Sequence, residues 1–291
     1  MLHSDTDQSS ALLQADATSL VERAELERQV QEMYRSVARD PNAPRHFETG
    51  RAVALHLGYP EPLLDSIPAA ALASFAGVGY HLDLASLVPG DEVLDLGSGS
   101  GTDVFSAAHQ VGPSGRVVGI DFTDEQIDKA TRLRDRDGFA HVEFVNASID
   151  ELPFADASFD AVISNGVINL SPVKHRVFAE AARVLRPGGR LAIADIVSGR
   201  PLKELTRRNV ELWAACIAGA IPRHNYLETL EDAGLRISDV RANDYDFLSE
   251  RAVDACSTYG VESISLAAVR GGVAPAIGTT TQSFDPRRLR T

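Results

Sequence analysis

The sequence has little cysteine, no histidine cluster and no long apolar run, and each shortage excludes a class of protein. Its 291 residues include two cysteines, Cys216 and Cys256, which form no CxxC pair and no disulfide framework. The eight histidines are scattered without an HExxH or similar motif, so we expect no metal site. The longest uncharged stretch, residues 66–82, is rich in alanine and glycine and is broken by a proline, which argues against a membrane span.

Positive charge is also scarce. Asp and Glu number 41 against 28 Lys and Arg, which gives a formal net charge of −13 at pH 7. Such a surface repels phosphate backbones and anionic lipids, so we expect neither nucleic acid nor membrane as a partner. The first residues lack the basic and apolar regions of a secretory signal, and the first Lys or Arg is Arg23. We therefore expect a cytoplasmic protein; association into a homo-oligomer stays open.

Changes in composition divide the chain into four predicted parts. These are a disordered tail at residues 1–20, a helical cap or lid segment at 21–84, a main domain at 85–270 and a flexible tail at 271–291. Within the cap segment, apolar residues three or four apart predict a helix over residues 21–38, and a second helix is expected over 51–57. A loop-rich region is expected from there to residue 82.

From residue 92 onward, short apolar runs alternate with segments typical of helices. The predicted strands are residues 93–96, 117–120, 142–145, 161–164, 191–196, 236–240 and 263–269. Continuous apolar strands that alternate with helices are typical of a mostly parallel sheet covered on both faces. The sequence thus predicts a doubly wound α/β domain.

Local signals mark several helix boundaries in this domain. Thr123 followed by Gln126 has the pattern of a capping box. Ser171-Pro172 supplies an N-cap and a proline at the first position of a helix that is expected to reach Leu185. Further helices are expected over residues 103–110, 203–218 and 225–234.

A glycine loop follows the first predicted strand of the main domain. Gly97, Gly99 and Gly101 stand between that strand and a helix, which is a nucleotide-binding arrangement because glycines admit a ligand close to the backbone. Two details differ from a dinucleotide site: Thr102 occupies the place of its third glycine, and Asp95 ends the strand. A carboxylate there would repel a diphosphate and attract a cationic amine. S-adenosylmethionine, which carries an ammonium and a sulfonium but no phosphate, fits this pattern.

Asp121 ends the next predicted strand, twenty residues after Gly101. A carboxylate in that place can accept both ribose hydroxyls of a nucleoside. The sequence therefore favours an S-adenosylmethionine-dependent enzyme. A nicotinamide-dependent oxidoreductase, a non-catalytic binding protein and a purely structural glycine turn are the alternatives.

Four motifs together resemble those of class I S-adenosylmethionine-dependent methyltransferases over about residues 85–200. They are Asp95–Gly101, Asp121, Leu152-Pro153-Phe154 and Leu185-Arg186-Pro187-Gly188-Gly189. The resemblance implies a Rossmann-like seven-stranded sheet, mostly parallel with the last strand antiparallel. It also implies that S-adenosylmethionine binds at Asp95, Gly97, Ser98, Gly99, Gly101, Asp121, Phe122, Ser148, Ile149 and Asn165. The family usually has an acid where this chain has Ser148.

A closer likeness concerns the methyl acceptor. Residues 163–172, 111–115 and 217–220 resemble the arsenite methyltransferases, which hold trivalent arsenic through cysteine thiolates. Two of the three thiol positions are Gly166 and Val78 here, and only Cys216 is kept. One thiol does not make a trigonal arsenic site. We therefore expect a small organic acceptor, for example in natural-product tailoring, with arsenite as the alternative.

Candidates for the acceptor pocket and for catalysis come from four segments. They are Asn165 and Asn169 to orient the acceptor, His81 as a general base, Tyr34 as a lid over the cofactor, and Gly166, Trp213, Cys216 and Tyr80 as pocket walls. Each has a plainer alternative: the asparagines can cap the following turn, His81 can be an ordinary histidine, and the apolar side chains can simply be core.

Overall fold

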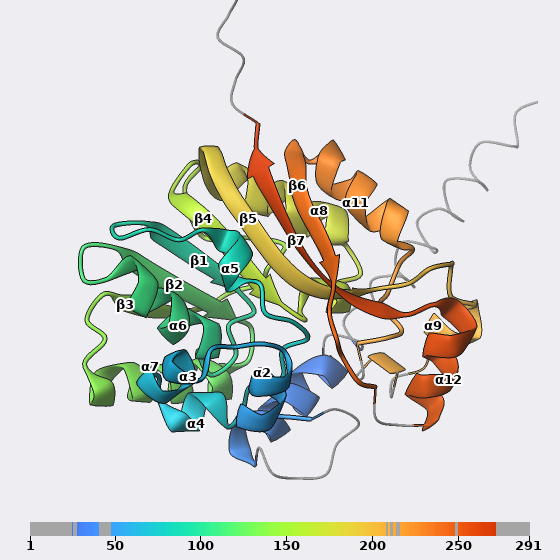
Figure 1. The fold of residues 1–291 in the computed structure, drawn as a ribbon, viewed down its shortest axis with the longest axis horizontal. Helices are drawn as coiled ribbons and strands as arrows, with labels where there is room; N and C mark the ends of the chain where they lie inside the picture. Colours follow the sequence, from blue (N-terminus) through green and yellow to red (C-terminus); the bar gives the residue numbers. More distant parts are fainter. Residues whose placement is uncertain are drawn as a thin grey trace, which may run out of the picture.

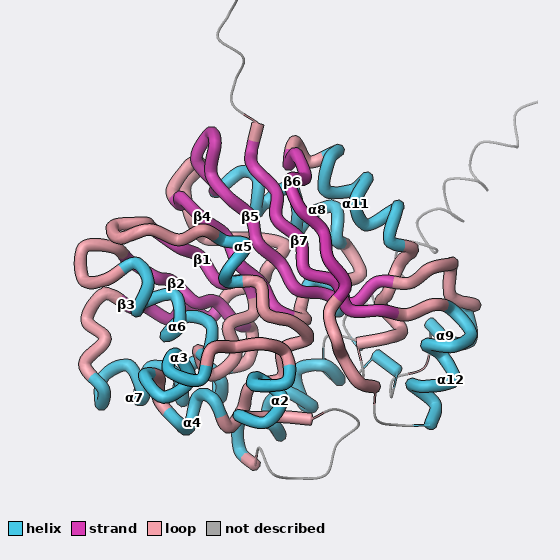
Figure 2. The backbone as a smooth tube through the Cα atoms, viewed as in Figure 1, coloured by secondary structure: helices cyan, strands magenta, loops and turns pink. Residues whose placement is uncertain are grey.

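A seven-stranded sheet forms the centre of the computed structural model, which describes residues 25, 28–40, 48–207, 209, 212–213, 216–247 and 250–271 (Figures 1 and 2). The strands are β1 (Glu92–Leu96), β2 (Arg116–Asp121), β3 (Val142–Asn146), β4 (Phe159–Asn165), β5 (Leu185–Val197), β6 (Leu235–Ala242) and β7 (Glu262–Arg270). All seven predicted strands are confirmed. The tails predicted at residues 1–20 and 271–291 lie outside the described residues, apart from Gly271.

The strand order is β3-β2-β1-β4-β5-β7-β6. Strands β1 to β5 pair in parallel, whereas β7 pairs antiparallel with both β5 and β6. This confirms the predicted doubly wound sheet with its last strand reversed. The order reverses between β1 and β4, and in open α/β sheets ligands bind at such a switch point, beyond the carboxyl ends of the strands.

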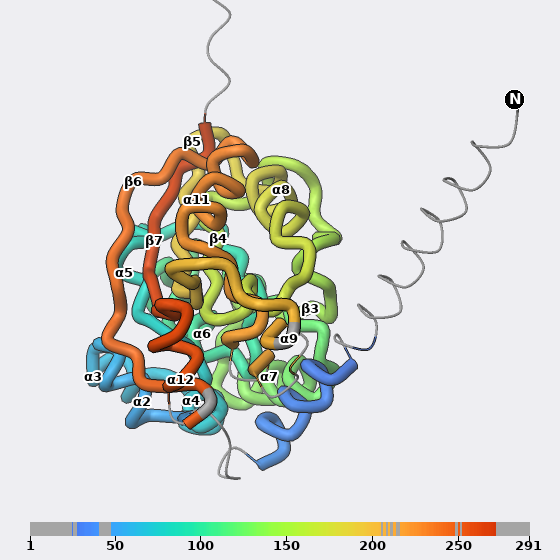
Figure 3. The backbone as a smooth tube through the Cα atoms, turned by 90° about the vertical axis from the view of Figure 1, so that its right-hand side faces the viewer, coloured from blue at the N-terminus to red at the C-terminus, as the bar shows by residue number. Residues whose placement is uncertain are grey.

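Each face of the sheet buries its own apolar layer because successive side chains of a strand point to opposite sides. Val93 and Val117 pack with α6 (Thr102–Val111) and α7 (Asp124–Asp137). Their neighbours Leu94 and Val118 pack on the other face with α8 (Lys174–Val184) and α11 (Arg223–Asp232). Figure 3 shows α5 (Leu82–Ala85) and α8 on opposite sides of β7. Both faces are thus covered, as the continuous apolar strands predict.

The cap segment contains more helix than the sequence predicts. Residues 28–39 are helical, and α2 (Arg51–His56) lies where a helix is expected. The predicted loop region, however, contains α3 (Glu61–Ser66) and α4 (Ala69–Leu72), each of which begins after a proline. Proline fixes a φ angle that suits a helix start, so these prolines begin helices.

Two further helix predictions need correction. The helix expected over residues 203–218 is not continuous, because α9 (Glu204–Arg207) is followed by non-helical Asn209, and Cys216 has a φ of +59°. Conversely, α12 (Glu250–Tyr259) was not predicted. Searched across the described residues, no helix is long and apolar enough to cross a membrane.

The helix start predicted at Thr123 is confirmed, but its capping box and the cap predicted at Ser171 are wrong. Thr123 is the N-cap of α7, but its side chain makes no capping bond, and the Gln126 side chain instead contacts Ser100 and the Tyr34 carbonyl. Tertiary contacts therefore override the local capping box. Helix α8 begins only at Lys174, because the 3₁₀ helix η1 (Ile168–Leu170) and a turn precede it.

Candidate functional site

A cavity of about 240 Å³ lies at the carboxyl end of β1, at the switch point of the sheet. Its lining comes from the 28–39 helix, residues 74–77, the glycine loop and the ends of β2 and β4. It includes every residue predicted for the cofactor except Gly101, namely Tyr34, Asp95, Gly97, Ser98, Gly99, Asp121, Phe122, Ser148, Ile149 and Asn165. The structure therefore brings together residues spread over more than 130 positions of sequence.

The three loop glycines have different reasons to be glycine. All have positive φ values, which favour residues without a side chain. A Cβ on Gly97 would lie 2.5 Å from the Val167 methyls, and one on Gly101 would lie 2.8 Å from the Phe144 ring. A Cβ on Gly99 would meet only Gln126, at 4.0 Å. Gly97 and Gly101 are therefore needed for packing, whereas the Gly99 backbone is open to a ligand.

The cavity is negatively charged. Asp95, Asp103 and Asp121 line it, and none of the described lining residues is Lys, Arg or His. Burial, followed by the charges of Asp103 and Asp121, raises the pKa of Asp95 well above its ordinary value. Nowhere in the described part of the chain is a group of three or more His, Cys, Asp or Glu arranged to hold a metal ion. The charge of this cavity therefore suits an organic cation.

Asp121 is held at the end of β2 by two backbone donors. The N–H groups of Gly99 and Thr123 donate to its carboxylate at 3.0 and 2.9 Å. Burial raises the pKa of Asp121, while these donors oppose the shift. The carboxylate keeps acceptor capacity on both oxygens, because each oxygen has two lone pairs.

Asp150 supplies the acid that Ser148 appeared to lack. The Ser148 hydroxyl donates to Asp150, which is 6% exposed and also lines the cavity. The acid thus stands two residues later in the sequence, on the same loop. Sequence reasoning missed it because it compared single positions, whereas the loop brings both side chains to one place.

The 28–39 helix docks beside the cavity, at the lower edge of Figure 1. The Gln31 amide donates to the Phe122 carbonyl at 2.8 Å. Arg35 forms an ion pair with Glu125 of α7, also at 2.8 Å, and the Gln126 amide donates to the Tyr34 carbonyl at 3.1 Å. This docking places Tyr34 in the wall of the cavity, where a lid residue is predicted.

The three positions compared with arsenic ligands lie together in space. A Cβ on Gly166 would be 3.3 Å from Val78 Cγ1, and Cys216 Sγ lies 3.7 Å from the Gly166 carbonyl oxygen. Burial and the charge of Asp195 raise the pKa of Cys216 to about 12, although a hydrogen bond with Tyr34 opposes the shift. The single thiol here is thus protonated at neutral pH. Of the other two positions, Val78 has an apolar side chain and Gly166 has no side chain.

The three candidates for catalysis occupy different environments. Asn165 ends β4 and lines the cavity. Asn169 is fully buried, and its side-chain amide donates to the Cys216 carbonyl. His81 is fully buried outside the cavity lining, and burial lowers its pKa. Neither asparagine caps α8, and only Asn165 can reach a ligand in the cavity.

The residues predicted as pocket walls do not line the cavity. Gly166, Cys216, Trp213 and Tyr80 are absent from its lining. The Trp213 indole N–H donates to the Arg207 carbonyl at 2.6 Å, and the Tyr80 ring packs on Tyr59 with 4.7 Å between the ring centres.

Several lining residues were missed by sequence reasoning. They are Val30, Ser74, Phe75, Ala76, Gly77, Ser100, Thr102, Asp103, Gln126, Asp150, Val167, Leu170, Ser171 and Pro172. Asp103 carried a usable signal, because an acid in the first turn after a glycine loop is close to any ligand of that loop. Ser100, Thr102 and Asp150 also adjoin predicted cofactor residues in sequence. The others carried no signal, since their approach to the cavity depends on the tertiary fold.

Comparison with known proteins agrees with this geometry. A methyltransferase domain model matches residues 87–234. Arsenite methyltransferase of Halobacterium salinarum is 41% identical over 180 residues, which are 61% of this chain and 46% of that protein. Arsenite methyltransferase of Aquipseudomonas alcaligenes is 39% identical over 197 residues, which are 62% of this chain and 56% of that protein.

Among solved structures, an arsenic (III) S-adenosylmethionine methyltransferase from Chlamydomonas reinhardtii superimposes with a TM-score of 0.58 at 31% identity. The match covers 77% of this chain and 74% of the Chlamydomonas chain. The chain spans about half the length of the curated relatives it matches.

Proposed function

The chain belongs to the S-adenosylmethionine-dependent methyltransferases, and from that premise we propose that it transfers a methyl group from S-adenosylmethionine to a small organic molecule. The observation that carries the proposal is the cavity, in which carboxylates meet a glycine loop without a positively charged side chain among the described lining residues. Such a site favours a ligand with positive charge and no phosphate.

The residues present fit this cofactor. Asp95 would hold the ammonium of its amino-acid end beside the open backbone of Gly99, and Asp121 would accept the ribose hydroxyls. Phe122 would flank the adenine, and Asp150 would accept its amino group. A dinucleotide would instead place a diphosphate beside Asp95, where two like charges would repel in a medium of low dielectric.

The cofactor, when bound, supplies a methyl group on a sulfonium that is already a good leaving group. The chain has to hold the acceptor in line with that methyl group and keep water out. Tyr34 and Val30, on the docked helix, would exclude water. Neither His81 nor Asn169 lines the cavity, so a base for the acceptor would have to be one of the lining carboxylates. We propose an acceptor with a lone pair that is free at neutral pH, which needs no base.

Part of the described cavity wall is apolar. Val30, Phe75, Ala76, Val167 and Leu170 contribute to it. We therefore propose an acceptor with an apolar body. Arsenite is the second candidate, favoured by the names of the relatives and opposed by Val78 and Gly166 in place of thiols.

The test has two stages. Calorimetric titration with S-adenosylmethionine and, separately, with NAD is expected to show binding of the first only; the reverse result would exclude the proposal. Production of S-adenosylhomocysteine is then measured with apolar aromatic amines, thioethers and arsenite as acceptors, all of which keep a free lone pair at neutral pH. Turnover with arsenite alone would establish the second candidate instead.

Arg35→Ala is expected to loosen the docked helix and to speed release of S-adenosylhomocysteine. The variant loses the ion pair with Glu125 of α7, in which both side chains are about three-quarters buried, and a pair with Glu32 on its own helix. The more exposed Arg39 still pairs with Glu125. Pairs of this kind contribute up to about 1 kcal/mol, so we expect dissociation roughly two- to fivefold faster. Stopped-flow fluorescence measures this rate. Arg28→Ala, which removes only the pair with Glu25 on the same helix, is the matched control; equal rates in both variants would contradict the role of the docked helix.

A further inference from the structure

Three polar side chains from separate elements meet at the cavity. Tyr59 follows α2, Asp103 lies in the first turn of α6, and Asn165 ends β4. The Tyr59 hydroxyl donates to Asp103 Oδ1 at 2.6 Å. Asn165 Nδ2 lies 3.0 Å from the Tyr59 oxygen and 3.1 Å from Asp103 Oδ2. Each side chain of the network therefore contacts both others.

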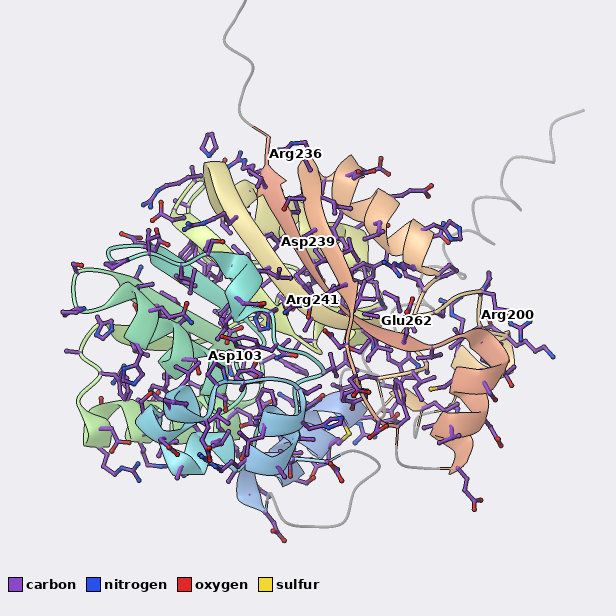
Figure 4. All side chains as sticks on the ribbon, viewed as in Figure 1. Asp103, Arg200, Arg236, Asp239, Arg241 and Glu262 are labelled. Atoms are coloured by element: carbon purple, nitrogen blue, oxygen red, sulfur yellow. The ribbon has the colours of Figure 1, made fainter. Side chains whose placement is uncertain are left out.

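The surroundings fix the orientation of this network. The Val78 N–H donates to Asn165 Oδ1 at 2.8 Å, so the amide nitrogen must face Tyr59 and Asp103. The Tyr59 ring packs against Phe75, with 5.1 Å between the ring centres, and the residue is 2% exposed. Figure 4 labels Asp103 on the side of the sheet that carries the N-terminal helices. Buried partners thus hold the Asp103 carboxylate in one position.

The network does not exhaust the acceptor capacity of Asp103. A carboxylate offers about four lone pairs, and Tyr59 and Asn165 use one on each oxygen. Asp103 lines the same cavity as Asp95, and the two repel each other there. Two carboxylates that share a buried site without a basic side chain in the described lining are stabilised by a cation between them.

We infer that Asp103, held by Tyr59 and Asn165, is a second receptor beside Asp95 for the ammonium group of the bound S-adenosylmethionine. This rests on the proposed function. Asp103 touches the cofactor, whereas Tyr59 is a positioning residue that acts through it. A bound ammonium donates to both carboxylates and thereby removes their repulsion.

The test compares two ligands that differ in this group. S-adenosylhomocysteine carries the amino-acid end, and 5′-methylthioadenosine lacks it. Asp103→Asn is expected to weaken binding of S-adenosylhomocysteine roughly tenfold, as for loss of one charge-assisted hydrogen bond, and to leave binding of methylthioadenosine within about twofold. Tyr59→Phe keeps the Asp103 carboxylate but removes the hydroxyl that holds it. It is expected to cause a smaller loss of affinity, again for S-adenosylhomocysteine and not for methylthioadenosine.

Asp124→Asn is the matched control, because Asp124 is also in the first turn of its helix but bonds to Asn146 outside the cavity lining. It should leave both affinities unchanged. Equal losses for both ligands in Asp103→Asn would mean a merely structural role, and an unchanged affinity for S-adenosylhomocysteine would exclude any role; either overturns the inference. If the unaltered protein binds neither ligand, the proposed function itself fails.

Discussion

Asp95→Asn is expected to weaken cofactor binding and, at the same time, to stabilise the protein without ligand. The substitution removes a buried carboxylate that faces Asp103 and Asp121. The ammonium group of the ligand loses a charged partner, so we expect the Kd for S-adenosylhomocysteine to rise roughly 10- to 100-fold. The ligand-free protein loses only repulsion and desolvation, and its free energy of unfolding should rise by about 1–2 kcal/mol, or several degrees in Tm.

The raised pKa of Asp95 predicts how stability and cofactor affinity depend on pH. Because the pKa of Asp95 is higher in the folded than in the unfolded protein, the folded state binds the proton more tightly. This residue's contribution to stability therefore falls as pH rises from the unfolded pKa through the folded pKa. Cofactor affinity should rise over the same window, because only the ionised carboxylate attracts the ammonium. The free energy of unfolding and the cofactor affinity should both depend less on pH in Asp95→Asn.

Asp91→Asn is the matched control, at the opposite end of the same strand. Asp91 is also buried, but it is paired with Arg190 at 2.5 Å and accepts the Val88 N–H. Its loss should lower Tm and leave the Kd unchanged. Differential scanning fluorimetry and calorimetry measure both quantities. If Asp95→Asn destabilised the free protein as Asp91→Asn does, Asp95 would be a structural rather than a ligand-binding carboxylate.

The double substitution Val78→Cys with Gly166→Cys is expected to create an arsenite site. Val78 lies beside Gly166, Gly166 lies beside Cys216, and Val78 and Cys216 belong to one buried cluster, so the variant is expected to bring three thiols together. Once one thiol holds trivalent arsenic, each further bond forms within one molecule, and we expect binding at least about 100-fold tighter than in the unaltered protein. Gly166 has a φ of +71°, so a side chain there costs about 1–2 kcal/mol of stability.

Titration with arsenite in a thiol-free reductant measures this gain. Adding Cys216→Ser to the double variant should reverse most of it, and Val78→Cys alone should give an intermediate affinity. If the unaltered protein already binds arsenite as tightly as the double variant, the missing thiols do not decide the acceptor. The proposed organic acceptor would then have to be abandoned for arsenite.

The sheet could be predicted from sequence because its strands are continuous apolar runs bounded by polar residues. Two examples are the strands at Val93–Leu96 and Val117–Ile120, which local sequence identifies without knowledge of their neighbours in the sheet. The predicted role of Asp95 and Asp121 in cofactor binding then follows from their positions at the ends of these strands. The capping role predicted for Gln126 was wrong because the prediction used only neighbouring residues. Its side chain instead contacts Ser100 and Tyr34, which are distant in the sequence.

The acceptor side was harder to predict for the same reason. Tyr59 and Asp103 are 44 residues apart and form a pair only because α6 packs against the cap segment. Trp213 and Tyr80 have the composition of pocket walls, but the fold turns both away from the cavity. Asn165, the one candidate for catalysis at a strand end, is also the one that lines the cavity.

The most direct measurement is calorimetric titration of the unaltered protein with S-adenosylhomocysteine in two buffers of different ionisation enthalpy. We expect binding to be linked to release of protons, because the ammonium group of the ligand favours the ionised form of Asp95, whose pKa is raised in the free protein, and we expect this release to disappear in Asp95→Asn. Binding of NAD in place of S-adenosylhomocysteine, or binding with uptake of protons, would contradict a carboxylate-lined site for a cationic cofactor.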